Sequence, residues 1–244
     1  MTGWGPLIGV ALVSSAATAL GTFALVQARA GDNVRAYLLD HPEVLQEASD
    51  KLRLKQAAAQ IAPLRRDLET PYAQGYIGAK DGNVTLVQFF DYACGYCKAA
   101  LADLQRLVRE DPKVKVVFRE LPILSRESEA AARVSLFAAE RGRYGAFHQA
   151  MYDAGRPSAA SIPAAARAAG LDTGQLQQAL ASPQAEREIA KNVELARALG
   201  FSGTPAWVVG EQLMSGAVGY DALKEAVAKA RENRPAERPR FVTG

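Results

Sequence analysis

The chain has 244 residues, of which 49% are hydrophobic and 23% charged, so it can bury a full core and is globular. Its 29 basic and 26 acidic residues are spread along the sequence, and the small net charge of +3 argues against a nucleic-acid partner. Only two cysteines occur, Cys94 and Cys97, whereas a structural disulfide framework would use more cysteines and longer loops. The pair therefore indicates a chemical role and not a structural one.

The first thirty residues are directed to a membrane, because no charge occurs from Trp4 to Val26. The length of residues 4–26 favours an inner-membrane anchor, which needs about 20 apolar residues, over a signal peptide, whose apolar run is roughly 7–15. Against this, Ala28-Arg29-Ala30 resembles the small-x-small pattern of a cleavage site, so that residues 1–30 could be removed near Ala30. Under either alternative we expect residues 31–244 to be exported to the periplasm.

An amphipathic helical stretch follows over residues 32–61, where apolar residues recur at three- and four-residue steps between charged ones. Pro42 interrupts the stretch, and because proline suits the first turn of a helix, two helices are expected to meet there. The apolar stripe needs cover, either from its own domain or from another subunit. We predict a helical stalk over residues 31–71, with residues 32–62 as a candidate surface for homo-oligomerisation.

The main domain is expected over residues 72–233. The run Val84–Phe90 is apolar, β-branched or aromatic and follows a turn signal, which predicts a buried strand. A helix should follow the cysteines and end near Asp111-Pro112. The alternation from Lys113 to Glu120 predicts a second strand. Strand, helix and strand in this order predict a right-handed crossover and a parallel pair.

The second half of this domain is expected to be mainly helical. Residues 125–200 are rich in Ala, Arg, Glu and Gln with breaks at Gly and Pro, which predicts several helices inserted between the halves of a sheet. Residues 206–209 and 212–214 should form a hairpin around Gly210-Glu211, followed by a helix from Tyr220 to about Asn233. The tail, residues 234–244, mixes Pro, Arg and Glu and is predicted to be disordered.

The cysteine pair follows the first strand directly. A strand that ends at Tyr92 and a helix that begins near Cys94 place the first sulfur beside the free N–H groups of a helix N-terminus. The positive end of the helix stabilises a thiolate, which is the nucleophile in disulfide exchange. We therefore expect Cys94 to attack, and Cys97, one turn later on the same side, to resolve the mixed disulfide.

The residues between and beside the cysteines are expected to tune the pair. Gly95 and Tyr96 form the spacer that sets the redox potential, and Lys98 adds a positive charge. Zinc sites use the same C-x-x-C spacing, but structural ones demand four ligands, and the chain adds only His41 and His148. We expect no metal site and no cofactor other than the redox-active disulfide itself.

Three motifs resemble those of the DsbA-type branch of the thioredoxin superfamily, which includes DsbA-like and Com1-like proteins. They are Phe89–Lys98 (FFDYACGYCK), Phe118–Leu124 (FRELPIL) and Gly203–Trp207 (GTPAW). They come in the family's order, and the resemblance covers about residues 76–232. It implies an α/β thioredoxin fold with an inserted helical subdomain, here preceded by the N-terminal membrane segment and the amphipathic helices.

The resemblance assigns Pro205 to a cis-proline loop against the cysteine pair. Proline has an inexpensive cis bond and no N–H, so Thr204 can offer its backbone to an extended substrate. Relatives often carry a buried acid six residues before the first cysteine, where Gln88 stands here. An amide cannot take the proton of Cys97, so water, Asp91 or another carboxylate would have to serve. We interpret Gln88 itself as a hydrogen-bonded polar residue of a strand, and we expect it to tune the pair together with Gly95, Tyr96 and Lys98.

Four further residues are expected to have packing roles. His148 is interpreted as a helix residue, because exchange needs no histidine when a helix supplies the charge. Trp207, Phe89 and Phe90 are expected in the core.

The sequence thus predicts an envelope thiol:disulfide oxidoreductase that forms or reshuffles disulfides in exported cysteine-containing proteins. The spacer, Thr204 and the stalk resemble isomerases, which must be kept reduced, whereas the general architecture resembles monomeric oxidases. We expect a membrane redox partner to recycle the pair. The alternative is a non-catalytic chaperone that holds unfolded clients, and the intact cysteine pair argues against it.

Overall fold

The computed structural model describes residues 33–233, and the chain divides into two compact units, Met1–Arg53 and Leu54–Gly244. In the first unit residues 33–40 are helical, and α2 (Glu43–Ile61) begins directly after Pro42 and continues into the second unit. The prediction that two helices meet at Pro42 is confirmed.

Two predicted segments, the membrane segment at residues 4–26 and the tail at 234–244, lie outside the described residues. Between residues 33 and 233, none of the helices combines the length and the apolar character that a membrane span requires.

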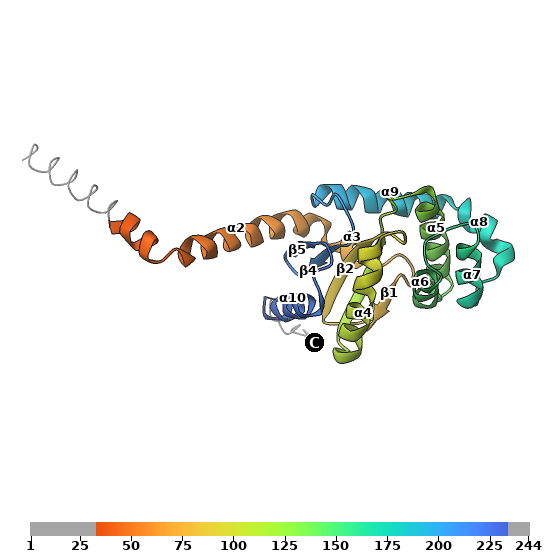
Figure 1. Cartoon of the computed structure of the whole chain (residues 1–244), viewed down its shortest axis with the longest axis horizontal. Coiled ribbons are helices and arrows are strands. Elements are labelled where there is room, and N and C mark those ends of the chain that lie inside the picture. The colour runs from red at the N-terminus through yellow and green to blue at the C-terminus, as the bar shows by residue number, and fades with distance from the viewer. Residues whose placement is uncertain (1–32, 234–244) are drawn as a thin grey trace, which may run out of the picture. The chain divides into compact units, whose positions relative to one another are not determined.

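The second unit is built on a mixed sheet of five strands in the order β1-β3-β2-β4-β5 (Figure 1). Strands β2 and β3 are parallel, and the register places Val84 opposite Val114 and Phe90 opposite Glu120. The pairs β1–β3, β2–β4 and β4–β5 are antiparallel. The strands are β1 (Tyr76–Gly78), β2 (Val84–Phe90), β3 (Val114–Glu120), β4 (Ala206–Val209) and β5 (Gln212–Ser215).

This sheet confirms the predicted strand–helix–strand unit with its parallel pair, and the hairpin around Gly210-Glu211. The α/β architecture with helices inserted between β3 and β4 is likewise confirmed. The sequence pattern does not indicate β1, because three residues are too few to show the two-residue period of a strand. Its end is set by Gly78, whose φ of +82° favours glycine.

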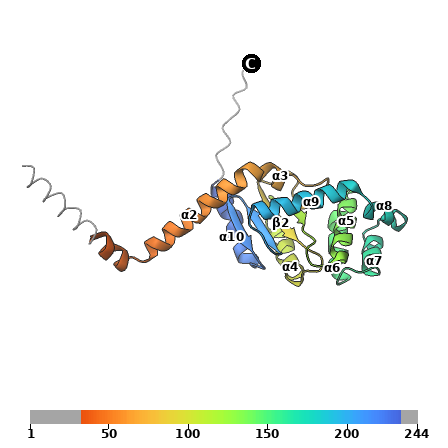
Figure 2. The ribbon, with the colours of Figure 1, turned by 90° about the horizontal axis from the view of Figure 1, so that it is seen from above.

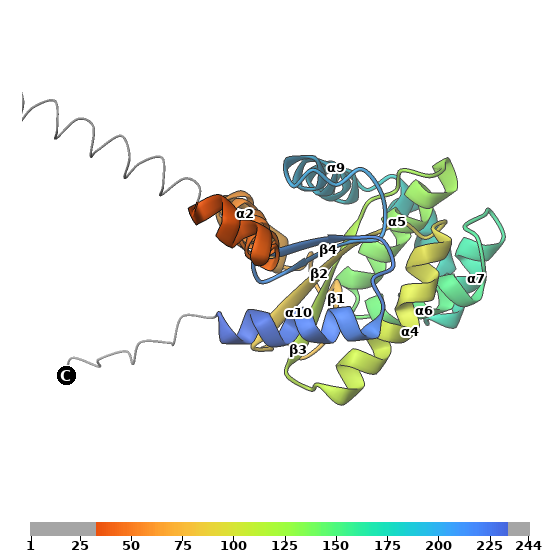
Figure 3. The same cartoon turned by 60° about the vertical axis from the view of Figure 1, so that its left-hand side comes forward.

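Helices cover both faces of the sheet. Helices α4 and α10 pack together on one face, and α9 lies on the other (Figure 3). Leu68 of α3 belongs to the same apolar cluster as α9. Helices α5 to α8 form the inserted subdomain at the end of the body away from α10 (Figure 2). The helices of the second unit are α3 (Arg65–Glu69), α4 (Gly95–Glu110), α5 (Arg126–Glu140), α6 (Tyr144–Asp153), α7 (Ser161–Ala168), α8 (Leu176–Leu180), α9 (Pro183–Ala198) and α10 (Tyr220–Glu232), with short 3-10 turns at Ala62–Leu64 and Thr173–Gln175.

The central strands feed two apolar clusters, because alternate side chains of a strand point to opposite faces. In β2, Phe90 joins the cluster that contains α4, α10 and the inserted helices. Its neighbour Phe89 joins the cluster on the other face, which includes α9 and the last turns of α2. Phe89, Phe90 and Trp207 are at most 1% exposed, which confirms that they belong to the core.

A buried arginine on β3 ties two helical segments to the sheet. The Arg119 side chain is fully buried and donates to Glu188 on α9 at 2.6 Å. It also donates to the carbonyl oxygens of Asp67, Leu68 and Thr70, at the end of α3. Burial lowers the pKa of Arg119, and the charge of Glu188 acts in the opposite direction. The network therefore depends on the carboxylate of Glu188 to neutralise a buried cation.

Glu188→Gln should lower the free energy of unfolding by about 3 kcal/mol, because it leaves the buried Arg119 guanidinium without its anion. Urea denaturation would measure this loss. The matched control is Glu194→Gln on the same helix, where the pair with Arg197 is exposed and its removal should cost less than about 1 kcal/mol. Equal losses in the two variants would contradict this account.

Candidate active site

Cys94 lies at the N-cap of α4, just after the turn that follows β2. Its sulfur accepts an N–H from Cys97 at 3.3 Å, and its thiol donates to the carbonyl oxygen of Thr204, also at 3.3 Å. The N–H groups of a helix N-terminus carry the positive end of its dipole, so they stabilise an anionic sulfur at this position. The prediction that a helix begins near Cys94 is confirmed, although β2 ends at Phe90 rather than at Tyr92.

Cys97 lies in the first turn of α4 and is 1% exposed. Burial raises the pKa of the Cys97 thiol well above its ordinary value, and a hydrogen bond from the backbone of Asp91 opposes this effect. Both cysteines are free thiols in the structure. The two sulfurs therefore differ in their surroundings. The Cys94 sulfur caps α4 beside Thr204, whereas the Cys97 sulfur is buried within the protein.

The peptide bond between Thr204 and Pro205 is cis, as expected for a cis-proline loop. The loop precedes β4, which pairs with β2, and this pairing brings the loop to the end of the sheet that carries the cysteines. Cys94 and Thr204 are in contact although 110 positions separate them in the sequence.

Asp91 connects the cysteine turn to the segment that follows β3. Its Oδ1 accepts the N–H of Ala93 at 2.7 Å, and its Oδ2 accepts the N–H groups of Ile123 and Leu124 at 2.9 Å each. The sequence leaves Asp91 open as a proton acceptor for Cys97. In the structure the carboxylate is occupied by these three donors, and the backbone of Asp91 is the part that approaches the Cys97 sulfur.

The residues expected to tune the pair differ in their exposure to solvent. Gln88 is in β2, 2% exposed, on the face of the sheet that carries Phe90. Gly95, Tyr96 and Lys98 are exposed on the first turn of α4, and Tyr96 is 71% exposed. Gln88 therefore lies within the protein, whereas the other three can meet a bound molecule.

The sequence pattern gives no sign of a buried acid between the sheet and the inserted helices. Glu120, at the end of β3, is 2% exposed and accepts hydrogen bonds from the hydroxyls of Ser135 at 2.5 Å and Tyr144 at 3.0 Å. Burial raises the pKa of Glu120 to about 7. Its partners lie on α5 and α6, so only the folded insert could have revealed this environment.

His148 lies in the same region and confirms its predicted packing role. It is 3% exposed, stacks on Tyr144, and its Nδ1 lies 3.1 Å from the hydroxyl of Tyr92. Burial lowers the pKa of His148 to about 3, so the ring is neutral. Tyr152 extends the cluster to the cysteine turn, because its hydroxyl donates to the carbonyl oxygen of Asp91 at 3.3 Å.

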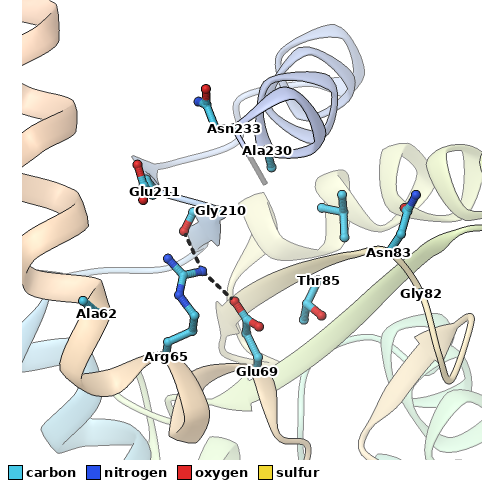
Figure 4. Close-up of a pocket in the computed structure, with 11 residues that line it drawn as sticks. Ala62, Arg65, Glu69, Gly82, Asn83, Thr85, Gly210, Glu211, Ala230 and Asn233 are labelled. Atoms are coloured by element: carbon cyan, nitrogen blue, oxygen red, sulfur yellow. Dashed lines mark hydrogen bonds and ion pairs between the residues drawn. The ribbon is translucent and has the colours of Figure 1, made fainter. Parts of the chain in front are cut away.

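A separate pocket of about 640 Å³ lies at the other end of the sheet, beside the start of β2 (Figure 4). Its Arg65 pairs with Glu69 at 2.9 Å and donates to the carbonyl oxygen of Gly210. Across residues 33–233, no group of three or more His, Cys, Asp or Glu side chains is placed to hold a metal ion.

Comparison with known protein families identifies the second unit. A family model described as "DSBA-like thioredoxin domain" matches residues 85–228, well over half of the chain. The chain belongs to this family. A second model, for the N-terminal domain of the copper resistance protein ScsC, matches residues 27–59.

Solved structures of similar proteins agree with this family. A thioredoxin-like oxidoreductase from Silicibacter pomeroyi DSS-3 is 43% identical, and the match covers 68% of this chain and 95% of that one with a TM-score of 0.64. A periplasmic thioredoxin-like protein from Salmonella enterica serovar Typhimurium is 31% identical, covering 69% and 96% with a TM-score of 0.63. The catalytic domain of Proteus mirabilis ScsC is 30% identical, covering 72% and 98% with a TM-score of 0.65.

The curated relatives are longer proteins. The Na(+)/H(+) antiporters NhaA 3 of Salinispora tropica and NhaA 1 of Salinispora arenicola are 29% and 26% identical over 193 and 176 residues. These matches take in 71% and 68% of this chain but only 29% and 27% of the antiporters. The chain thus spans less than a third of their length. The DsbA-type resemblance seen in the sequence is confirmed by the match to the DSBA-like thioredoxin domain.

Glu120 and His148 should make the free energy of unfolding depend on pH in opposite directions. Folded Glu120 keeps its proton up to about pH 7, against an ordinary pKa of 4.5, so its contribution is complete below pH 4.5 and is lost as the pH rises to 7. Folded His148 stays neutral down to about pH 3, against an ordinary pKa of 6.5, so its contribution is complete above pH 6.5 and is lost as the pH falls.

The substitution Glu120→Gln removes the loss of stability that Glu120 causes as the pH rises, and it leaves the contribution of His148 unchanged. Relative to the wild type, the free energy of unfolding of this variant should increase by about 1 kcal/mol per pH unit from pH 4.5 to 7. Urea denaturation at half-unit pH intervals would measure the difference. The exposed Glu194→Gln serves as the control and should follow the wild type. A constant difference between Glu120→Gln and the wild type would refute the assignment.

Proposed function

We propose that the protein exchanges disulfides with exported cysteine-containing proteins through Cys94 and Cys97. The observation that carries this proposal is the position of the Cys94 sulfur at the N-cap of α4, against the Thr204 carbonyl of the cis-proline loop. The helix end and the Cys97 N–H favour the thiolate, and the loop lies where an extended client segment would approach the sulfur.

In the reducing direction, the Cys94 thiolate attacks one sulfur of a client disulfide. A bond between Cys94 and the client forms as the client disulfide breaks, and the other client sulfur leaves and takes up a proton. Cys97 then attacks the Cys94 sulfur, which forms the Cys94–Cys97 disulfide and releases the second client thiol. Two electrons and two protons pass from the pair to the client, and client oxidation is the same sequence in reverse.

The unequal surroundings of the sulfurs support unequal roles. Burial raises the pKa of Cys97, so Cys97 stays protonated while Cys94 attacks. Its proton must leave before the mixed disulfide is resolved. Gln88 cannot accept it, the carboxylate of Asp91 is engaged by three N–H donors, and the carboxyl group of Glu120 is bonded to Ser135 and Tyr144 instead of to a cysteine. We therefore assign this proton transfer to water.

The neighbouring residues have assignable parts in this scheme. The exposed spacer residues Gly95 and Tyr96, together with Lys98, would set the redox potential and contact the client. Thr204 would bind the client backbone, and Pro205 would hold the loop in place. Gln88 would act from the buried side of the pair, where it offers an amide in place of a carboxylate.

We infer that exchange takes place in the periplasm, where a similar solved protein of Salmonella enterica is located. Residues 4–26 would either anchor the protein in the inner membrane or be removed near Ala30. A membrane redox protein would then recycle the pair. The direction of exchange follows from the state of Cys94 and Cys97 in the envelope, because an oxidase is kept oxidised and an isomerase reduced.

Single cysteine variants test the exchange. Cys97→Ser should accumulate a mixed disulfide with clients, because the resolving thiol is gone, whereas Cys94→Ser should form none and should reduce insulin only at the background rate. Non-reducing gels of trapped complexes and an insulin turbidity assay measure the two results. Wild-type insulin reduction and client maturation by Cys94→Ser would sink the enzymatic proposal in favour of a client-holding chaperone.

The stalk supports a second proposal, that copies of the chain associate through residues 32–62. In the described part of this segment large apolar side chains are exposed along the helices, which is unfavourable in water unless a partner covers them. They are Val34, Tyr37, Leu39, Leu45, Leu52 and Leu54.

Leu45→Ser with Leu52→Ser should reduce the mass in light scattering from that of an oligomer to that of a monomer, because these substitutions remove exposed apolar area of α2. Truncation of the stalk is a poorer test, since Ile61 of the same helix is fully buried in the core. Glu47→Ser with Lys51→Ser is the matched control and should keep the wild-type mass. The same monomeric mass in all three proteins would exclude the stalk as an interface.

A further inference from the structure

Beyond the stalk, the exposed large apolar side chains of the described residues gather at the cysteine pair. Of the described residues from 55 onward, only Tyr96, Ile123 and Leu124 are large, apolar and exposed, at 71%, 48% and 53%. Tyr96 stands between the two cysteines in the sequence. Ile123 and Leu124 belong to the segment between β3 and α5, which has no regular secondary structure of its own.

Asp91 places this segment beside the reactive turn. One oxygen of its carboxylate holds the N–H of Ala93, which precedes Cys94, and the other holds the N–H groups of Ile123 and Leu124. A single side chain therefore fixes the distance between the attacking sulfur and the two exposed apolar residues.

The three hydrogen bonds of Asp91 tether residues 123 and 124 to the cysteine turn, and this tether depends on a carboxylate. Asp91 is 2% exposed, and no Lys, Arg or His side chain forms an ion pair with it anywhere in residues 33–233. A buried anion without a counter-charge is costly, so its stabilisation comes from the three N–H donors, and hydrogen bonds to a charged acceptor are the stronger ones. Asparagine has one acceptor oxygen and would turn an NH₂ group toward one of the two sets of donors.

We propose that Asp91 is a positioning residue for client recognition: it fixes Ile123 and Leu124 as an apolar wall for the side chain next to the client's reacting cysteine. The inference rests on the proposed disulfide exchange and names its substrate class, extended segments in which a bulky apolar residue adjoins the cysteine. Segments of this kind are exposed in unfolded exported proteins and buried after folding, since cysteine and its apolar neighbours are core residues. Asp91 acts through the backbone of the wall and does not touch the client.

Two short peptides of equal length and charge provide the test. Each carries one cysteine as a mixed disulfide with thionitrobenzoate, flanked by leucine in one peptide and by serine in the other. The reduced protein supplies the electrons: Cys94 attacks the peptide sulfur and releases the coloured thiolate, and Cys97 then frees the peptide thiol. The wild type should release the colour about tenfold faster from the leucine peptide, because contact with the wall buries apolar area.

Asp91→Asn should reduce this preference to about twofold, and Ile123→Ser with Leu124→Ser should abolish it. The second variant changes exposed residues only, so it tests the wall even if the buried substitution impairs folding. The matched control is Asp172→Asn, where an aspartate also accepts a backbone N–H, from Gly174, but in the inserted helices. This control should keep the full preference.

Equal rates with both peptides in the wild type would overturn the inference while leaving the exchange intact. Full preference in Asp91→Asn would overturn the positioning role. Absence of colour release from either peptide would instead refute the proposed exchange itself.

Discussion

The junction between β2 and α4 is the constraint on which the rest of the site depends. The central strand β2 is hydrogen-bonded along both edges, so the turn at its end has little freedom, and α4 starts directly after that turn. One neighbouring strand, β3, delivers Asp91's partners at 123 and 124, and the other, β4, follows the loop of Thr204. The sheet thereby brings backbone from two distant segments to the cysteine turn, because Thr204 contacts the Cys94 sulfur and residues 123 and 124 contact Asp91.

Because alternate side chains of β3 point to opposite faces of the sheet, its two buried charged residues lie in separate environments. Arg119 faces α3 and α9, whereas its neighbour Glu120 faces α5 and α6. Although they are adjacent in sequence, Arg119 and Glu120 form no ion pair with each other, and each has its own buried partners. This arrangement attaches the inserted helices to the sheet by hydrogen bonds as well as by apolar packing, close to the turn that carries Cys94.

Much of the fold follows from local patterns. The strands β2 and β3, the hairpin, the helix start at Cys94 and the cis bond before Pro205 are each marked by a run, a turn signal or a motif of a few residues. The tether of Asp91 and the cluster of Tyr92 and His148 could not be predicted, because they join positions 32 to 56 residues apart. No local periodicity encodes such contacts, and they arise only when the insert packs on the sheet.

The position of the insert has a consequence for how the chain acquires its reactivity. In the sequence, residues 94 and 204 flank the inserted helices and are 110 positions apart, and the hairpin of β4 and β5 completes the sheet last in chain order. A chain that emerges from its N-terminal end first can assemble β2, α4 and β3 while the second edge of β2 is still open. During that interval α4 can already form at Cys94, but Thr204, whose carbonyl oxygen contacts the Cys94 sulfur in the complete fold, has not yet joined the sheet. We therefore expect the Cys94 thiol to be more accessible in the incomplete chain than in the folded protein, where it is 6% exposed.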